Sequence, residues 1–158
     1  MRPLTSLSTL FKCTIRSPEP KDFERMANLA EQLGYPCTAN QIGERLAGID
    51  KSKDYVVFVA QLPGGQIAGW IAAYIFRAVE LDICAEISGL IVDEQVRSRG
   101  IGKALLEAVE KWARSYGCNA ISVHSKNERV RAHVFYIRNG YQYIKSQKYF
   151  QKMLAQLS

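Results

Sequence analysis

Residues 92–103 combine glycine, arginine and lysine in a pattern suited to binding an anion. The segment joins an apolar stretch, predicted to be a strand, to a strongly amphipathic stretch that is predicted to be a helix. Gly100 lets the backbone approach a ligand closely, and the unpaired N–H groups of a first helical turn attract negative charge. Arg97, Arg99 and Lys103 add cationic side chains. The sequence therefore predicts a phosphate or pyrophosphate site here.

The spacing of Gly100 and Gly102 excludes two common phosphate-binding motifs. A Walker loop would need G-x-x-x-x-G-K-[ST], and a dinucleotide fingerprint would need a third glycine where Leu105 stands. The four cysteines are widely spaced, with no C-x-x-C pair, and the two histidines do not complete a zinc pattern. We expect reduced thiols and no metal site.

The length of 158 residues, with 47% hydrophobic and 23% charged residues, predicts one globular domain over residues 1–158. Apolar runs such as residues 55–60 are far shorter than the roughly 20 residues that a membrane span needs. The N-terminal residues show no signal-peptide pattern. We expect a cytoplasmic protein that does not associate with a membrane.

Hydrophobic periodicity predicts an α+β fold with a mixed, mostly antiparallel sheet of six to seven strands, flanked by about four helices. The crossover helix that follows the phosphate-binding segment requires its two neighbouring strands to be parallel. Residues 141–154 are expected to supply one or two closing strands. The other expected strands cover residues 12–16, 54–61, 66–76, 82–92 and 119–125, and the expected helices cover residues 18–33, 39–47, 100–116 and 128–138.

Charge is distributed unevenly along the chain, whose 21 basic and 15 acidic residues give a net charge of +6. Residues 1–96 hold 9 basic and 12 acidic side chains, whereas residues 97–158 hold 12 and 3. This asymmetry suits a C-terminal half that binds a compact polyanion, and a generally basic surface is the simpler alternative. Nucleic acid is not favoured as a partner, because neither a helix-turn-helix pattern nor an aromatic RNA-binding platform is found.

Two motifs in register resemble the GNAT superfamily of N-acetyltransferases. The pattern Arg-x-x-Gly-x-Gly at residues 97–102, between a predicted strand and an Ala/Leu-rich helix, resembles the acyl-CoA loop of that superfamily. Residues 132–136 (Ala-His-Val-Phe-Tyr), followed by Gly-Tyr at residues 140–141, resemble its later motif. The resemblance covers residues 12 to about 154. It implies an enzyme that uses acetyl-CoA as co-substrate, without a metal.

The resemblance also implies that two parallel strands, residues 83–92 and 119–125, splay apart to admit the pantetheine arm of CoA. A splayed strand has free N–H and C=O groups to offer. Where the superfamily places a CoA-contacting asparagine, this chain offers Asn127, with Lys126 as the alternative. The residues implied to bind CoA are Leu90, Ile91, Val92, Arg97, Ser98, Arg99, Gly100, Ile101, Gly102, Lys103 and Asn127.

Two residues are implied to be catalytic. Tyr136 matches the usual general acid, which protonates the departing thiolate, and an ordinary tyrosine pKa near 10 keeps its phenol neutral at pH 7. Glu86 lies where some members carry a glutamate that deprotonates the amine, often through water. The alternatives are a core aromatic for Tyr136 and a structural or solvated carboxylate for Glu86.

The acceptor implied by the resemblance is a primary amine, and the acidic residues of the N-terminal half favour a cationic one. Trp70 and Tyr74 alternate on one strand and are expected to line its site. A small metabolite or antibiotic-type amine is the first expectation, a peptide or protein amine the second, and a non-catalytic acyl-CoA-binding or nucleic-acid-binding module the third. Dimers are common in the superfamily, so a homodimer is also allowed. The acidic residues concerned are Glu24, Glu31, Glu44, Asp50, Glu80, Asp82 and Glu86.

Overall fold

The computed structural model describes residues 12–157, which divide into two compact units at the boundary between His124 and Ser125. The second unit contains one helix, α4 (Val130–Arg138), followed by residues 139–157. Within the described part of the chain, no helix has the length and apolar character needed to cross a membrane. The first unit contains β1 (Thr14–Arg16), η1 (Pro20–Asp22), α1 (Phe23–Leu33), α2 (Ala39–Ile49), β2 (Tyr55–Gln61), β3 (Ile67–Phe76), β4 (Cys84–Val92), η2 (Glu94–Val96), α3 (Ile101–Ser115) and β5 (Ile121–Val123).

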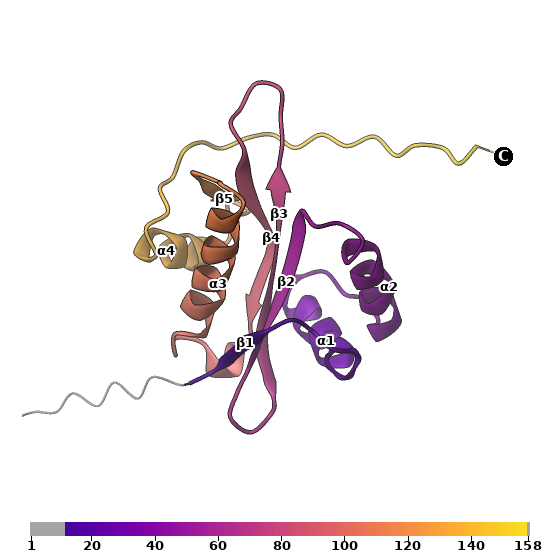
Figure 1. Ribbon diagram of the computed structural model, residues 1–158, viewed down its shortest axis with the longest axis vertical. Helices are drawn as coiled ribbons and strands as arrows, with labels where there is room; N and C mark the ends of the chain where they lie inside the picture. The colour runs from indigo at the N-terminus through magenta and orange to yellow at the C-terminus, as the bar shows by residue number, and fades with distance from the viewer. Residues whose placement is uncertain (1–11, 158) are drawn as a thin grey trace, which may run out of the picture. The chain divides into compact units, whose positions relative to one another are not determined.

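The five strands of the first unit form one sheet in the order β1-β2-β3-β4-β5. Neighbouring strands are antiparallel except β4 and β5, which are parallel and joined by the α3 crossover. Helices α1 and α2 lie on one face of the sheet and α3 lies on the other (Figure 1). The sheet is therefore covered on both sides, and its central strands alternate between two buried surfaces.

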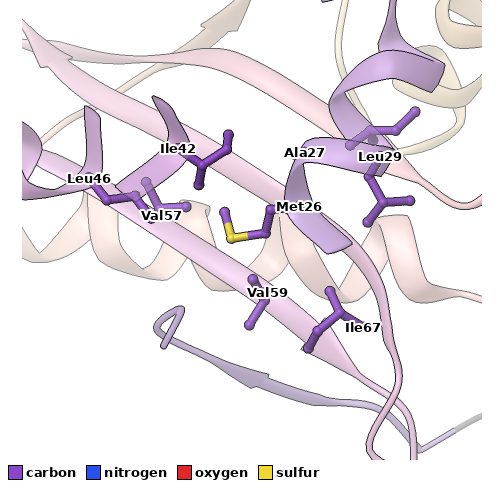
Figure 2. Close-up of a cluster of buried hydrophobic side chains, with 9 residues drawn as sticks. Met26, Ala27, Leu29, Ile42, Leu46, Val57, Val59 and Ile67 are labelled. Atoms are coloured by element: carbon purple, nitrogen blue, oxygen red, sulfur yellow. The ribbon is translucent and has the colours of Figure 1, made fainter. Parts of the chain in front are cut away.

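Apolar stripes on the helices form the core. On one face, Met26 of α1 and Ile42 of α2 pack over Val57 and Val59 of β2 (Figure 2). On the other face, α3 buries one stripe at helical spacing, which keeps its polar residues in solvent. The residues of that stripe are Ile101, Leu105, Leu106, Val109 and Ala113.

Most of the predicted elements are confirmed within one to three residues of their expected bounds. The prediction of closing strands in residues 141–154 is wrong, because those residues form neither helix nor strand. Over residues 12–157 the sheet has five strands instead of six to seven. A strand exists only through its hydrogen-bonded neighbour, so the high β-propensity of Tyr, Ile and Phe does not by itself produce one.

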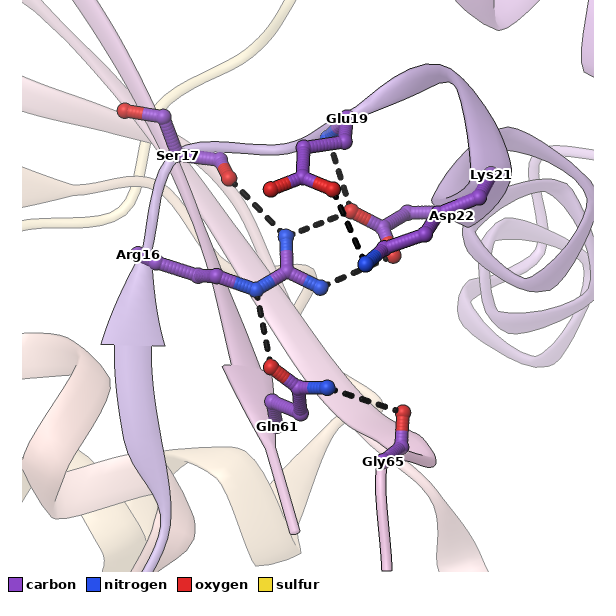
Figure 3. A network of polar contacts seen from close by, with 7 residues as sticks. All are labelled: Arg16, Ser17, Glu19, Lys21, Asp22, Gln61 and Gly65. Carbon is purple, nitrogen blue, oxygen red and sulfur yellow. Dashed lines mark hydrogen bonds and ion pairs between the residues drawn. The ribbon is translucent and has the colours of Figure 1, made fainter.

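A network around Asp22 ties the edge of the sheet to the start of α1 (Figure 3). The guanidinium of Arg16 donates to both carboxylate oxygens of Asp22, at 2.7 and 3.0 Å, and its Nε donates to Gln61 Oε1 at 2.9 Å. The backbone N–H of Glu19 also donates to Asp22, at 2.7 Å. The side chain of Asp22 is only 4% exposed. The hydrogen bonds from Arg16 lower the pKa of Asp22 although burial opposes them.

We expect Asp22→Asn to lower the free energy of unfolding by about 2 kcal/mol at pH 7, since the half-buried Arg16 loses its counterion. The native pKa of Asp22 lies below its unfolded value, so this stabilisation is complete above pH about 4 and is lost as pH falls through the native pKa. Urea unfolding at several pH values measures the difference between wild type and variant, which should shrink in acid.

The exposed pair of Asp54 with Arg77, 3.4 Å apart, provides the control. Asp54→Asn should change the free energy of unfolding by less than about 0.5 kcal/mol, as solvent screens that pair. If the Asp22→Asn and Asp54→Asn variants were equally stable at pH 7, the stabilising role of the Arg16–Asp22 ion pair would be contradicted.

Candidate active site

Strands β4 and β5 pair over only three positions. Ala85, Glu86 and Ile87 face Ile121, Ser122 and Val123, while β4 continues to Val92. Within the described residues, positions 89–92 of β4 have a neighbour on the β3 side but no strand on the β5 side. The strand therefore presents a short row of backbone N–H and C=O groups along one edge, as a ligand that binds like an added strand requires.

A β-bulge at Ser88 separates this open edge from the paired part of β4. Ala72 faces Gly89 while Ala73 faces Ile87, so Ser88 is the extra residue. Its hydroxyl donates to Ala72 O at 3.3 Å and accepts from the Tyr55 hydroxyl at 3.0 Å. The exposed Ser88 side chain is thus held at the point where the two parallel strands stop pairing.

Trp70, which was expected to line an acceptor site, packs instead against the core under α1. Its indole N–H donates to Met26 O at 3.2 Å, and its ring lies across Gly89 of β4. A Cβ at Gly89 would come within 2.9 Å of that ring, so glycine is needed there for the close approach. Trp70 thereby fixes α1 against the part of β4 that carries the open edge.

Asp93 anchors the chain where it leaves β4. Its buried carboxylate accepts from Arg25 Nη2 at 2.5 Å and from the backbone N–H of Gln95 at 3.2 Å, which caps η2. Gln32 Nε2 donates to Asp93 Oδ1 at 3.4 Å. Burial alone would raise the pKa of Asp93, but the hydrogen bonds from Gln95 and Arg25 hold it below the ordinary value. Helix α1 thus fixes the start of the segment that is expected to bind phosphate, residues 92–103.

The segment then turns into α3 through two left-handed residues. Ser98 has φ 66° and Gly100 has φ 82°, a conformation that favours glycine. A Cβ built on Gly100 meets no atom within 4 Å, so the space above the turn is open. Arg97 Nε donates to Val92 O at 3.2 Å and so closes the loop back onto the end of β4.

The first turn of α3 leaves its amides without a side-chain cap. The buried Ile101 side chain holds the start of the helix in the core, and Gly100 offers no capping group. The first intrahelical bond runs from Ala104 N to Gly100 O, at 3.1 Å. The N–H groups of residues 101–103 therefore have no intrahelical acceptor and suit an anion, as the sequence predicts.

Glu86 stands in a polar row that crosses the sheet beside the open edge. Tyr55, Tyr74 and Glu86 are successive partners on β2, β3 and β4, so they lie on one face. The Tyr55 and Tyr74 rings stack at 5.5 Å. The Glu86 side chain is 19% exposed, and His124 Nε2 lies 3.3 Å from its Oε1. Burial, followed by a hydrogen bond to Glu86, raises the pKa of Tyr74 to about 12.

The other acids that were expected to favour a cationic acceptor do not share this environment. Glu86 alone among the seven is partly buried, and the remaining six are exposed on helices and loops. A carboxylate in partial burial attracts a cation more strongly than one in bulk solvent, because the effective dielectric is lower. The exposed acids are Glu24, Glu31, Glu44, Asp50, Glu80 and Asp82.

In the second unit, Tyr136 is a buried residue of α4. Its ring contacts Phe135 edge-on at 5.3 Å and Tyr141 at 5.5 Å, and its carbonyl accepts from the Tyr141 backbone at 3.0 Å. Burial raises the pKa of Tyr136, and the positive charge of Arg129 partly opposes this. Its phenol is therefore neutral at physiological pH. Its role as an acid stays a prediction.

Asn127 lies in an exposed turn that leads into α4. The turn is closed by the Arg129 backbone N–H, which donates to Lys126 O at 3.0 Å, and by His133 Nε2–H, which donates to the same oxygen at 2.9 Å. The carbonyl of Lys126 is thus occupied, whereas the Asn127 side chain is exposed. The implied contact of Asn127 with CoA stays a prediction.

A family model described as Acetyltransferase (GNAT) family matches residues 19–141. The chain belongs to the GNAT acetyltransferase family. The match begins just before α1 and includes residues 92–103, Glu86 and Tyr136. The resemblance, the α+β fold and the enzyme class predicted from the sequence are thereby confirmed.

The chain is similar to several other acetyltransferases in sequence or in fold. An aminoglycoside N(6')-acetyltransferase type 1 of Stenotrophomonas maltophilia is 28% identical over 145 residues, which is 89% of this chain and 94% of the relative. The structure of a GNAT family acetyltransferase from Staphylococcus aureus matches with a TM-score of 0.69 and 26% identity, covering 90% of this chain and 98% of the other. The fold also matches an aminoglycoside 6'-N-acetyltransferase from Acinetobacter baumannii, with a TM-score of 0.79 and 18% identity over 91% and 100% of the two chains.

Four polar residues of this GNAT domain were missed by the sequence reasoning: Tyr55, Ser88, Asp93 and His124. Each acquires its role through a partner distant in sequence, and Arg25 and Asp93, for example, are 68 residues apart. For Asp93 a local signal exists, because aspartate directly after a strand is a favoured helix-capping residue. No local signal marks the other three.

Glu86→Gln should lower the pKa of Tyr74 from about 12 toward, but not to, the ordinary value near 10. The substitution removes the charge of Glu86 and leaves the burial of the phenol unchanged. Titration of 13C-labelled tyrosine by NMR, with Tyr74→Phe to assign the signal, measures the shift. The exposed Asp82→Asn is the matched control and should leave it unchanged. An equal pKa in wild type and Glu86→Gln would show that the two side chains do not interact.

Proposed function

We propose that this GNAT acetyltransferase moves an acetyl group from acetyl-CoA to a primary amine of a small cationic molecule, of the metabolite or antibiotic type. One observation carries the proposal: the partly buried Glu86, which has Tyr74 and Tyr55 as its partners on the two neighbouring strands, lies on the same strand whose open edge leads into residues 92–103. A site for an amine and a site for an acyl donor are therefore adjacent along β4.

The residues of the first unit fit CoA. The left-handed Gly100 leaves open space where a side chain would project, and the uncapped amides of α3 and the nearby cations suit a pyrophosphate. The open edge of β4 suits the amides of a pantetheine arm. Bound acetyl-CoA would supply the activated thioester. We assign its binding in the first unit to Leu90, Ile91, Val92, Arg97, Ser98, Arg99, Gly100, Ile101, Gly102 and Lys103. From the family resemblance alone, we also propose a contact with Asn127 of the second unit.

Two side chains of this chain are assigned proton transfers. Glu86 removes a proton from the acceptor ammonium, directly or through a water, so that the nitrogen lone pair becomes available. Tyr136 donates its phenolic proton to the departing sulfur. The raised pKa of Tyr136 supports this role, because the residue must enter the reaction protonated. Attack is direct, so the enzyme needs no nucleophile of its own.

A cationic acceptor is supported by the surroundings of Glu86. Stacked Tyr55 and Tyr74 present aromatic surface beside the carboxylate, and aromatic rings with a carboxylate are a combination that attracts ammonium groups. The names of two relatives also point to amine acceptors. One is the aminoglycoside N(6')-acetyltransferase described above. The other is an aminoalkylphosphonate N-acetyltransferase of Salmonella typhimurium, which is 32% identical over 81 residues, 51% of this chain and 53% of the relative.

Gly100→Glu should raise the KM for acetyl-CoA at least about tenfold, because it adds a side chain and a negative charge above the uncapped amides. Release of the CoA thiol, assayed with a panel of cationic and neutral amines, tests the function directly. Wild type should turn over cationic amines faster than neutral amines of equal size.

Gly117→Glu is the matched control, since Gly117 also has a left-handed φ of 78° and open space around it but lies at the far end of α3. Both variants should lose about 1 kcal/mol of stability, and only the one at Gly100 should lose affinity for acetyl-CoA. If none of the amines in the panel supported thiol release, the proposed function would be refuted. Equal KM values of the two variants for acetyl-CoA would refute the assignment of Gly100 to the acetyl-CoA site.

Tyr136→Phe should keep acetyl-CoA binding and lower kcat at least about a hundredfold, the size of effect typical of a lost general acid. Removing the hydroxyl leaves the ring contacts with Phe135 and Tyr141 in place, so folding should be preserved. Steady-state kinetics and a binding titration separate the two effects. Full turnover by the variant would show that Tyr136 is a core aromatic only.

A further inference from the structure

Glu86 must release a proton after every acetyl transfer if it acts as the base of the proposed reaction. An ammonium nitrogen loses two protons when it becomes an amide. One of them makes up for the proton that Tyr136 gives to the sulfur, and the other leaves through Glu86. The Glu86 side chain is only 19% exposed. Its exchange with solvent is therefore restricted, which favours a neighbouring group that carries the proton away.

Two titratable neighbours of Glu86 keep their own protons. The phenol of Tyr74 on β3 hydrogen-bonds to Glu86, and burial together with this bond raises its pKa to about 12. The thiol of Cys84, two residues earlier on β4, also has a raised pKa, first because of burial and then because of the charge of Glu86. Both groups therefore stay protonated near neutral pH and offer no basic form that could take up the proton.

The hydroxyl groups around the carboxylate have other partners. Ser122 of β5 is the register partner of Glu86, and its hydroxyl donates to Ala85 O at 3.5 Å. The Tyr55 hydroxyl, one strand further away on β2, donates to the Ser88 hydroxyl at 3.0 Å. A neutral hydroxyl accepts a hydrogen bond but is a very weak base. These groups border the carboxylate without being able to carry its proton.

His124 is the neighbour that can take up the proton. It directly follows β5, and its Nε2 lies 3.3 Å from Glu86 Oε1. Its side chain is 70% exposed, against 19% for Glu86, so the imidazole connects the partly buried carboxylate with solvent. Histidine is the side chain that gains and loses protons most readily in the physiological pH range. Both residues belong to the first unit.

We propose that His124 relays to solvent the proton that Glu86 takes from the acceptor ammonium, an inference that rests on the proposed function. The Glu86 carboxylic acid gives its proton to the lone pair of His124 Nε2, which regenerates the carboxylate and forms an imidazolium ion. The exposed imidazolium then loses a proton to water or buffer and becomes neutral again. One proton leaves for each acetyl group transferred, and no further reactant is needed.

Steady-state kinetics of His124→Gln in dilute buffer test the proposal. With a cationic amine, kcat should fall at least about tenfold, while the KM for acetyl-CoA should stay within about twofold of wild type. Added imidazole should restore the kcat of the variant as its concentration rises and leave wild type unchanged, because free imidazole takes the proton in place of the lost side chain. Tetramethylammonium chloride at equal ionic strength should restore nothing.

Two further variants separate a relay from a structural role. In a Glu86→Gln background, His124→Gln should cause no additional loss of kcat, because residues that act as a unit have non-additive effects. His133→Gln makes the same change at the other histidine of the chain, whose Nε2–H donates to Lys126 O in the turn before α4. Imidazole should not raise the kcat of that variant, since the side chain removed carries no proton from Glu86.

Three outcomes would overturn the relay but leave the proposed function intact. These are a His124→Gln variant with the kcat of wild type, a reduced kcat that imidazole does not restore, and an equal loss of kcat with and without Glu86. In the last case His124 would act independently of the carboxylate. If wild type released no thiol with any amine, the proposed function itself would be refuted, and the relay with it.

Discussion

Strands β4 and β5 pair over only a short stretch, and the candidate site depends on this constraint. After three paired positions the partner strand ends, and the remainder of β4 keeps backbone polar groups on one edge that the sheet does not satisfy. Such groups cost free energy unless water or a ligand pairs with them. This edge lies between a partly buried carboxylate and a helix that begins with uncapped amides, and on this arrangement we base its proposed role in binding acetyl-CoA.

The rest of the first unit holds that arrangement in place. Trp70 crosses Gly89 and bonds to α1, while Arg25 of the same helix binds Asp93 at the exit of β4. The network of Arg16 and Asp22 secures the start of that helix to the edge of the sheet. Because one helix contacts β4 at both points, a displacement of α1 would move the open edge and the loop together. The buried ion pairs therefore act as positioning contacts for the loop.

Features that depend on neighbours in sequence could be predicted, and features that depend on distant partners could not. Residues 92–103 could be proposed as a phosphate-binding segment because glycines, cations and an amphipathic helix follow one another in the chain. Glu86 was proposed through family resemblance, but its neighbours are distant in sequence, because Tyr55 lies on β2 and His124 directly follows β5. The bulge at Ser88 appears only once the register of β3 and β4 is known. The closing strands were wrongly predicted for the same reason, because propensity in residues 141–154 says nothing about which strand lies beside them.

The central claim is that the open edge of β4 and the start of α3 together bind acetyl-CoA. Calorimetric titration of the purified, full-length protein with acetyl-CoA tests it most directly. The account predicts one site per chain with a dissociation constant on the order of micromolar, the range in which a charged pyrophosphate and several backbone hydrogen bonds place such a ligand. An absence of binding at millimolar acetyl-CoA would contradict the account and remove the co-substrate from it.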